Sequence, residues 1–192
     1  RNAERHLLQM SDLVRDMFDT AKLENDAFEL AITPDVLMHE IVEEINAEFA
    51  ANPDVLSLRS IPDHTITATL DRDRIRQVIR NVVSNAAKYR QTGKQATIAV
   101  LLHRVDDIYF EIVVDDTPNG LGMTQTDLEA LNSGQPFWRA EAAKAVATGT
   151  GLGVQLSRKL VERSGGEIFY ESEFGVGTTV TIRLPYSPIE NS

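Results

Sequence analysis

The chain contains no cysteine. Without thiols it can form no disulfide, no thiolate zinc site and no cysteine nucleophile, which suits the cytosol. No stretch of it approaches the roughly 18 apolar residues that a membrane-spanning helix needs. Basic residues are also few, because 19 Lys and Arg stand against 29 Asp and Glu, for a formal charge of −10. That balance argues against a nucleic-acid partner but not against a small anionic ligand, since a local group of donors decides that.

The first part of the chain carries a heptad pattern that is typical of a bundle or coiled-coil helix. Over residues 5–24 the apolar side chains step alternately by three and four positions, at Leu7, Met10, Val14, Met17 and Ala21. One helix cannot bury such a stripe alone. We therefore expect a second copy of the chain as its partner, with packing back onto its own domain as the alternative. The chain begins at Arg1 inside this pattern, and we expect it to be a piece of a longer protein.

The 192 residues, of which 42% are hydrophobic, are enough for one domain with a core and an appendage. We divide them into an appended helix at 1–26, a domain at 27–187 and a tail at 188–192. Periodicity and turn residues predict strands at 28–32, 55–59, 65–70, 96–104, 108–115, 167–173 and 178–184. Helices are predicted from Thr33 as N-cap and Pro34 to about residue 50, after Asp71 as N-cap, at 124–131 and at 151–164. Helices mixed with largely antiparallel strands predict an α+β fold, a two-layer α/β sandwich.

The domain is organised around the stretch Arg74–Tyr89. Its apolar residues recur at three- and four-residue steps, so one face lies in a core. Asn81, Asn85 and Lys88 share a second face, at i, i+4 and i+7. Such a line is either the wetted side of a surface helix or a ligand site, and three glycine-rich segments downstream favour the ligand site. Amide oxygens suit Mg²⁺, which takes one or two protein ligands beside substrate phosphates, and a lysine one turn on would meet a phosphate.

The glycine-rich segments each have a plain alternative. Residues 149–153, GTGLG, precede a helix and suit phosphates, although a simple turn also explains them. Asp116 continues the core-facing row of the strand before it and needs a donor, such as an adenine amino group; an ordinary capped turn is the alternative. Gly175–Thr178 closes a hairpin, and the turn alone explains these residues without any function. If Asp116 contacts an adenine, we expect Thr178 to lie near the same adenine. The stretch 133–150 has little apolar pattern, and we expect it to move.

Taken in order, five segments resemble the N, G1, F, G2 and G3 boxes of sensor histidine kinases. The segments are Asn81-x3-Asn85-x2-Lys88-Tyr89, Asp116 with Gly120 and Gly122, Phe137-x-Arg139, Gly149-x-Gly151-x-Gly153 and Gly175-x-Gly177-Thr178. The resemblance covers residues 28–185, and residues 5–24 resemble the second helix of the dimerisation and phosphoacceptor hairpin. It implies a Bergerat-type ATP-binding sandwich of the GHKL superfamily, the kind shared with gyrase, Hsp90 and MutL.

The resemblance also implies roles for individual residues. Asn85 would be the main Mg²⁺ ligand with Asn81 beside it, Lys88 would meet a phosphate, and Asp116 would accept the adenine amino hydrogen, with Asp115 as the alternative. The implied catalytic residues are Asn81, Asn85 and Lys88. The implied contacts to nucleotide are Asn81, Asn85, Lys88, Tyr89, Asp116, Gly120, Gly122, Met123, Phe137, Arg139, Thr148, Gly149, Thr150, Gly151, Leu152, Gly153 and Thr178, with Phe137 and Arg139 anchoring a lid between Gly122 and Gly149.

Two departures bear on the reaction. ATPases of this superfamily are known for a glutamate at the place of Asn81, and an amide cannot take a proton from water at neutral pH. We therefore expect phosphoryl transfer to a protein histidine, with an ATP-hydrolysing relative disfavoured. Asp116 also lies four residues before Gly120 instead of two, so the loop carries a two-residue insertion containing Pro118. A degenerate, scaffold-like relative that binds ATP weakly or not at all is the alternative.

The phosphoacceptor is the remaining element of the resemblance. His39 lies in a sequence that lacks the basic residue and proline of the acceptor box, so we interpret it as a surface helix position. His6, His64 and His103 are also expected to be ordinary surface residues. The acceptor helix is therefore expected before Arg1. Implied partners are ATP, that helix of the same kinase, a response regulator and a second copy of the chain, in the cytoplasm, with the parent protein either membrane-anchored or not.

Overall fold

Helices and strands mix irregularly along the residues that the computed structural model describes, which are 29–133 and 152–188. The elements, in chain order, are β1 Thr33–Leu37, α2 Met38–Phe49, β2 Val55–Ile61, β3 Thr67–Leu70, α3 Arg72–Lys88, β4 Ala96–Arg104, β5 Tyr109–Asp115, α4 Gln125–Asn132, α6 Leu152–Arg163, β6 Glu167–Glu173 and β7 Gly177–Pro185. Within these residues no helix is both long and apolar enough to cross a membrane. The expected N-terminal bundle helix, the 133–150 segment beyond Ser133 and the last four residues lie outside this description.

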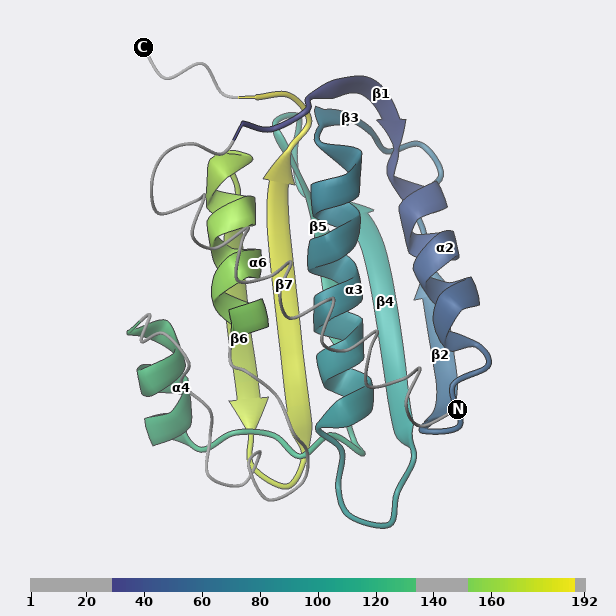
Figure 1. Cartoon of the computed structure of the whole chain (residues 1–192), viewed down its shortest axis with the longest axis vertical. Coiled ribbons are helices and arrows are strands. Elements are labelled where there is room, and N and C mark those ends of the chain that lie inside the picture. The colour runs from purple at the N-terminus through teal and green to yellow at the C-terminus, as the bar shows by residue number, and fades with distance from the viewer. Residues whose placement is uncertain (1–28, 134–151, 189–192) are drawn as a thin grey trace, which may run out of the picture.

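The main sheet has five strands in the order β2-β4-β5-β7-β6. Strands β2 and β4 pair in parallel, whereas β4, β5, β7 and β6 pair antiparallel. Figure 1 shows α2, α3 and α6 side by side over one face of this sheet, with α4 at the edge beside β6. The predicted two-layer α/β sandwich with a mixed, mostly antiparallel sheet is therefore confirmed.

Helix α3 begins where the sequence predicts. The side chain of Asp71 accepts a hydrogen bond from Arg74 N at 3.1 Å, which caps the first turn, and its other oxygen accepts from Ala31 N at 2.8 Å. The predicted apolar face is buried at every position: Ile75, Val78, Ile79, Val82, Val83 and Ala86. Because this face packs on the sheet, the Asn81 face is turned along the helical layer instead of into the core.

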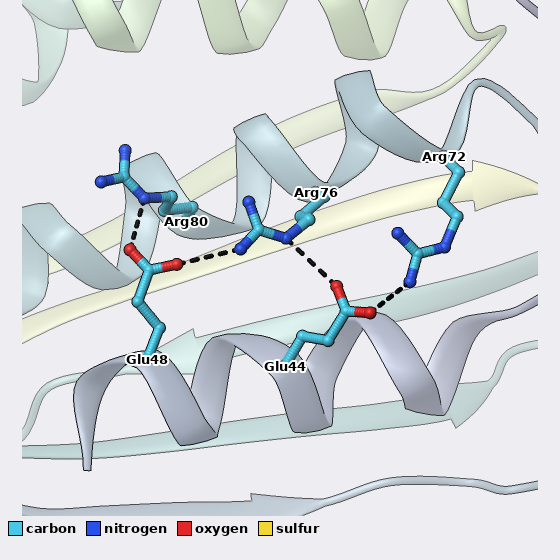
Figure 2. Close-up of polar contacts among 5 residues, drawn as sticks. All are labelled: Glu44, Glu48, Arg72, Arg76 and Arg80. Carbon is cyan, nitrogen blue, oxygen red and sulfur yellow. Dashed lines mark hydrogen bonds and ion pairs between the residues drawn. The ribbon is translucent and has the colours of Figure 1, made fainter. Parts of the chain in front are cut away.

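An ion-pair ladder joins α2 and α3 on the outer side of the helical layer. Figure 2 shows Glu44 and Glu48 of α2 alternating with three arginines one turn apart on α3. Glu44 contacts Arg72 at 2.5 Å and Arg76 at 3.2 Å, and Glu48 contacts Arg76 at 3.1 Å and Arg80 at 2.6 Å. Opposite charges one turn apart on both helices fix how α3 lies along α2.

The prediction for the start of the domain is wrong. Residues 29–32 form no strand, and Thr33 and Pro34 belong to β1 instead of capping a helix. Strand β1 pairs with β3 across a bulge between Thr33 and Val36, where Asp35 has a φ of 55°. A proline without an N–H is tolerated at such a bulge, and the pairing with β3 outweighs its preference for a helix start. Helix α2 consequently begins at Met38, whose N–H donates to Ile66 O at 3.1 Å.

Candidate functional site

Asn81 faces α6 and not solvent. Its Nδ2 donates to the hydroxyl of Ser157 at 2.9 Å, and Ser157 is 2% exposed. A Cβ on Gly153 would lie 2.5 Å from Asn81 Oδ1, so only glycine allows the first turn of α6 to come this close. The structure therefore brings the first amide of the predicted polar line against Gly153, the one glycine of residues 149–153 that lies in the described part of the chain.

Asn85 and Lys88 have unused polar groups. Both side chains are half-buried, and no residue of the described ranges hydrogen-bonds to the Asn85 amide or pairs with the Lys88 ammonium. The Lys88 Nζ lies 5.0 Å from the centre of the Tyr89 ring, within reach of a cation–π contact. The amide oxygen and the ammonium are thus available to a ligand.

Asp116 is a buried carboxyl group enclosed by glycines. It is 5% exposed and follows β5, where its N–H donates to Thr178 O at 3.1 Å and Thr178 N donates to its Oδ1 at 2.6 Å. A Cβ on Gly120 would lie 2.0 Å from Oδ1, and one on Gly177 would lie 2.7 Å from it. Within residues 29–133 and 152–188 no group donates to the second oxygen, Oδ2. One oxygen is therefore held by the backbone and one is left to accept.

Burial changes the acidity of this group. Loss of hydration raises the pKa of Asp116 to about 7, with the neighbouring charge of Asp115 adding to the rise and the hydrogen bond from Thr178 opposing it. A carboxylate that loses water and gains one backbone donor is undersatisfied. A further hydrogen-bond donor at Oδ2 would stabilise its charged form.

Asp115 has a different environment. Its Oδ1 accepts from Thr117 N at 2.9 Å and from Thr179 Oγ1 at 3.4 Å, and its Oδ2 accepts from Thr117 Oγ1 at 3.0 Å. Both oxygens are used in capping the turn. Of the two aspartates that the sequence left open, Asp116 is the one with spare accepting capacity.

Three loops meet beside Asp116 in what we term the three-loop junction: those joining α3 to β4, β5 to α4, and β6 to β7. Leu121 N donates to Tyr89 O at 2.8 Å, and Gly175 N donates to Leu121 O at 2.8 Å. Gly122 adopts a φ of 67°, and a Cβ there would lie 1.9 Å from Glu173 O, so the junction requires glycine at this position. Met123 N donates to Ser172 Oγ at 2.8 Å.

The remaining predicted site residues fall into two groups. Leu152 is buried at the start of α6, and the hydroxyl of Thr178 contacts Ser172 Oγ at 2.8 Å. The others lie outside the described residues: Phe137, Arg139, Thr148, Gly149, Thr150 and Gly151.

Three polar residues around the site were not predicted from the sequence: Ser157, Ser172 and Gln91. Ser157 was detectable in principle, since it is a polar residue that follows the inward-facing Leu156 on α6. Ser172 and Gln91 gave no signal, because their partners include backbone groups of loops that are distant in sequence.

Within residues 29–133 and 152–188, the histidines take no part in this site. His39 is half-buried on α2, where its ring packs edge-on against His64 with centroids 4.7 Å apart and its Nδ1 is buried. His103 Nε2 lies 3.4 Å from Glu111 Oε2 across the β4–β5 pair. In the described part of the chain no three His, Asp or Glu side chains gather to form a metal site of their own.

The domain matches a known family. Residues 70–188, which hold α3, the three-loop junction and α6, match the family described as histidine kinase-, DNA gyrase B-, and HSP90-like ATPase. This match covers more than half of the chain, and the chain belongs to that ATP-binding family.

Two proteins of this ATP-binding family that the chain resembles in sequence are histidine kinases. The chain is 38% identical over 183 residues to the histidine protein kinase DivJ of Caulobacter vibrioides, covering 94% of this chain and 29% of DivJ. It is 32% identical over 148 residues to the sensor histidine kinase WalK of Bacillus subtilis, covering 77% of this chain and 22% of WalK. The domain is thus a catalytic ATP-binding domain of the sensor histidine kinase type, and it spans less than a third of either relative.

Solved structures share the fold. The Acinetobacter baumannii histidine kinase AdeS matches with a TM-score of 0.68 at 22% identity, over 95% of this chain and 81% of that chain. Full-length ShkA, solved in complex with AMPPNP, matches with a TM-score of 0.74 at 23% identity, over 98% of this chain and 38% of that chain. At such identities the likeness concerns the fold alone.

Proposed function

We propose that this domain binds Mg-ATP and transfers the γ-phosphoryl group to a histidine of a separate phosphoacceptor helix in a two-component kinase. The observation that carries the proposal is Oδ2 of the buried Asp116, which has no donor among the described residues and lies in a loop joined to the end of α3 through Tyr89 and Leu121. The adenine amino group is the donor that this oxygen lacks. Asn85, one turn before Tyr89, and Lys88, directly before it, would then face the phosphates.

Magnesium fits the donor set of α3. Amide oxygens are hard ligands, and Mg²⁺ takes only one or two of them beside phosphate oxygens and water. Asn85 would be the main ligand, because its side chain has no partner among the described residues, whereas Asn81 already donates to Ser157. When bound, the ion would neutralise charge on the phosphates.

The protein residues would supply orientation and charge. Asn81 holds its amide against α6 and offers no group that accepts a proton from water, which favours transfer over hydrolysis. Lys88 would meet a phosphate with its ammonium group. The glycines of residues 149–153 and the lid anchored by Phe137 and Arg139 would wrap the phosphates, as the resemblance implies.

The partners follow from this chemistry. Beyond ATP we propose an acceptor helix of the same kinase, a response regulator and a homodimer formed through residues 1–26. The domain would work in the cytoplasm, where ATP is found. The formal charge of −10 supports a partner other than nucleic acid.

A phosphotransfer assay tests the proposal. The chain is mixed with γ-labelled ATP, Mg²⁺ and a purified histidine-bearing acceptor hairpin, and the expected product is an acid-labile, base-stable label on the hairpin. The same mixture without Mg²⁺ is the control. Steady release of free phosphate with no labelled hairpin would favour an ATPase instead.

A further inference from the structure

One side chain of the α3–β4 loop contacts both other loops of the junction. Gln91 follows α3, and its Nε2 lies 2.9 Å from Pro118 O, 3.1 Å from Gly120 O and 2.8 Å from Gly175 O. A side-chain amide nitrogen carries two hydrogens, so it can donate to three carbonyls when two of the carbonyls share one hydrogen. The amide oxygen would be repelled by these carbonyls, which fixes the orientation of the Gln91 amide. We propose that Gln91 is a positioning residue that sets the base selectivity of the nucleotide site by holding the loop after Asp116.

Main-chain hydrogen bonds fix Gln91 itself. Its N–H donates to Asn119 O at 2.9 Å, and Asn119 Nδ2 in turn donates to Gln95 O at 3.1 Å. The loop after α3 and the loop after β5 are therefore joined at both backbone and side chain.

The contact reaches Asp116 through Gly120. The Gly120 carbonyl accepts from Gln91, and the Gly120 N–H donates to Asp116 O at 2.8 Å. Because a Cβ at Gly120 would lie 2.0 Å from Asp116 Oδ1, a small movement of this residue would displace the carboxylate. Gln91 thus acts on Asp116 through an intermediate residue and need not touch the nucleotide.

The insertion in this loop explains why such a contact matters. Thr117 and Pro118 lengthen the loop between Asp116 and Gly120, and a longer loop has more conformations to lose when it is ordered. The Pro118 carbonyl is one of the three acceptors of Gln91. The inserted segment is therefore held in place by Gln91 through the Pro118 carbonyl.

The inference rests on the proposed function, and its test separates the two. We compare Gln91→Ala, Gln91→Glu and Gln91→Lys with Gln95→Ala, a matched control whose side chain donates to Pro53 O at 2.8 Å. The first measurement is amide hydrogen exchange of the ligand-free protein at Gly120, Leu121 and Gly175. The second is the affinity for Mg-ATP and for Mg-ITP, in which a carbonyl oxygen replaces the amino group of adenine.

Loss of the amide donors should speed exchange in the junction and lower ATP affinity by about five- to tenfold. ITP affinity should change by less than about twofold, because ITP has no amino group for Asp116. Gln91→Glu should be the most damaging, since carboxylate oxygens would face three carbonyls. Gln91→Lys keeps donors and should restore most of the ATP preference. Gln95→Ala should leave both measurements unchanged.

Three results would overturn the inference. If amide hydrogen exchange in the junction is unchanged in Gln91→Ala, Gln91 does not hold the loops, whatever the nucleotide affinities are. Equal losses for ATP and ITP would reduce Gln91 to a structural residue with no part in base selectivity. A folded wild-type protein that binds neither nucleotide would overturn the proposed function and this role together, while exchange alone would still report whether Gln91 holds the loops.

Discussion

The two ends of the proposed nucleotide site are built in opposite ways. At the base end, Asp116 and the three-loop junction are tied by backbone hydrogen bonds, and one carboxylate oxygen is already used by Thr178 N at 2.6 Å. At the metal end, the side chains of Asn85 and Lys88 make no hydrogen bond or ion pair with any residue of the described ranges. Recognition of the base is preorganised, whereas the donors for metal and phosphate are left open for the ligand to complete.

Helix α3 explains the difference between the two ends of the proposed site. The buried apolar face of α3 fixes the helix, so the Asn85 and Lys88 side chains keep their places without a hydrogen bond or ion pair to the described residues. The base end has no such helix and depends on hydrogen bonds between loops. Mutations at the metal end should therefore change ligand binding but not stability. Mutations at the base end should change both ligand binding and stability.

The largest effect is expected for Asn85→Ala. It should abolish the Mg²⁺-dependent part of ATP affinity, because the open amide oxygen is the main proposed ligand. The melting temperature without nucleotide should hardly move, since removing a side chain without partners changes stability by about 0.5 kcal/mol or less. Titration with and without Mg²⁺ checks this, with Ser84→Ala on the same helix as the control. Equal Mg²⁺-dependent binding by variant and wild type would remove Asn85 from the metal site.

Asp116→Asn should lower ATP affinity by roughly ten- to a hundredfold, the range expected for loss of a charge-assisted hydrogen bond. Asp115→Asn is the matched control, because both Asp115 oxygens are occupied by Thr117 and Thr179. Calorimetric titration of both variants measures the contrast. A larger loss for Asp115→Asn would exchange the roles of the two aspartates.

Deleting Thr117 and Pro118 should lower ATP affinity by about fivefold or more, since the deletion removes the Pro118 acceptor of Gln91. If the chain were a degenerate scaffold with an insertion that blocks the site, the same deletion would raise the affinity. Nucleotide fluorescence on the deletion variant and on wild type distinguishes the two directions.

Two opposite pH dependences are expected from Asp116. Its pKa is raised from 3.8 to about 7 in the fold, so its contribution to stability is fully present below about pH 3.8 and is lost as the pH rises through 7. ATP binding needs the carboxylate, so affinity should fall as the pH drops below about 7, and binding should release protons. Melting curves and titrations in buffers of different ionisation enthalpy measure both. The two trends should vanish in Asp116→Asn, and their persistence would assign them to another group.

The smallest effect is expected in the ladder between α2 and α3. A double-mutant cycle with Glu44→Ala and Arg76→Ala should give a coupling of about 0.2–1 kcal/mol, because these side chains are about a third or more exposed. The coupling should shrink at high salt. A coupling that stays constant in salt would show that the contact between Glu44 and Arg76 is not an ion pair.

Much of this fold was predictable from local patterns. The apolar period of α3, the Asp71 cap and strands β4 and β6 follow the sequence to the residue, because each element buries one face along its own length. The β1 region was missed because its conformation is decided by pairing with β3 across a bulge, about 30 residues away in sequence.

The site was predictable only in part, for the same reason. Asn81 and Asn85 stand out as amides one turn apart on α3, and Asp116 continues the core-facing row of β5, so their positions carry a signal. The choice between Asp115 and Asp116 depends on which oxygens the turn already uses, and the role of Gln91 depends on carbonyls from two distant loops. Neither leaves a pattern in the residues nearby.

The most direct test is a titration of the intact chain with ATP in the presence of Mg²⁺, repeated with EDTA and with ITP. Binding should weaken when the metal is removed and, independently, when the amino group is missing, because the two ends of the site recognise different parts of the ligand. A folded protein that shows no binding at about millimolar ATP, or binds ATP and ITP equally, would contradict the account.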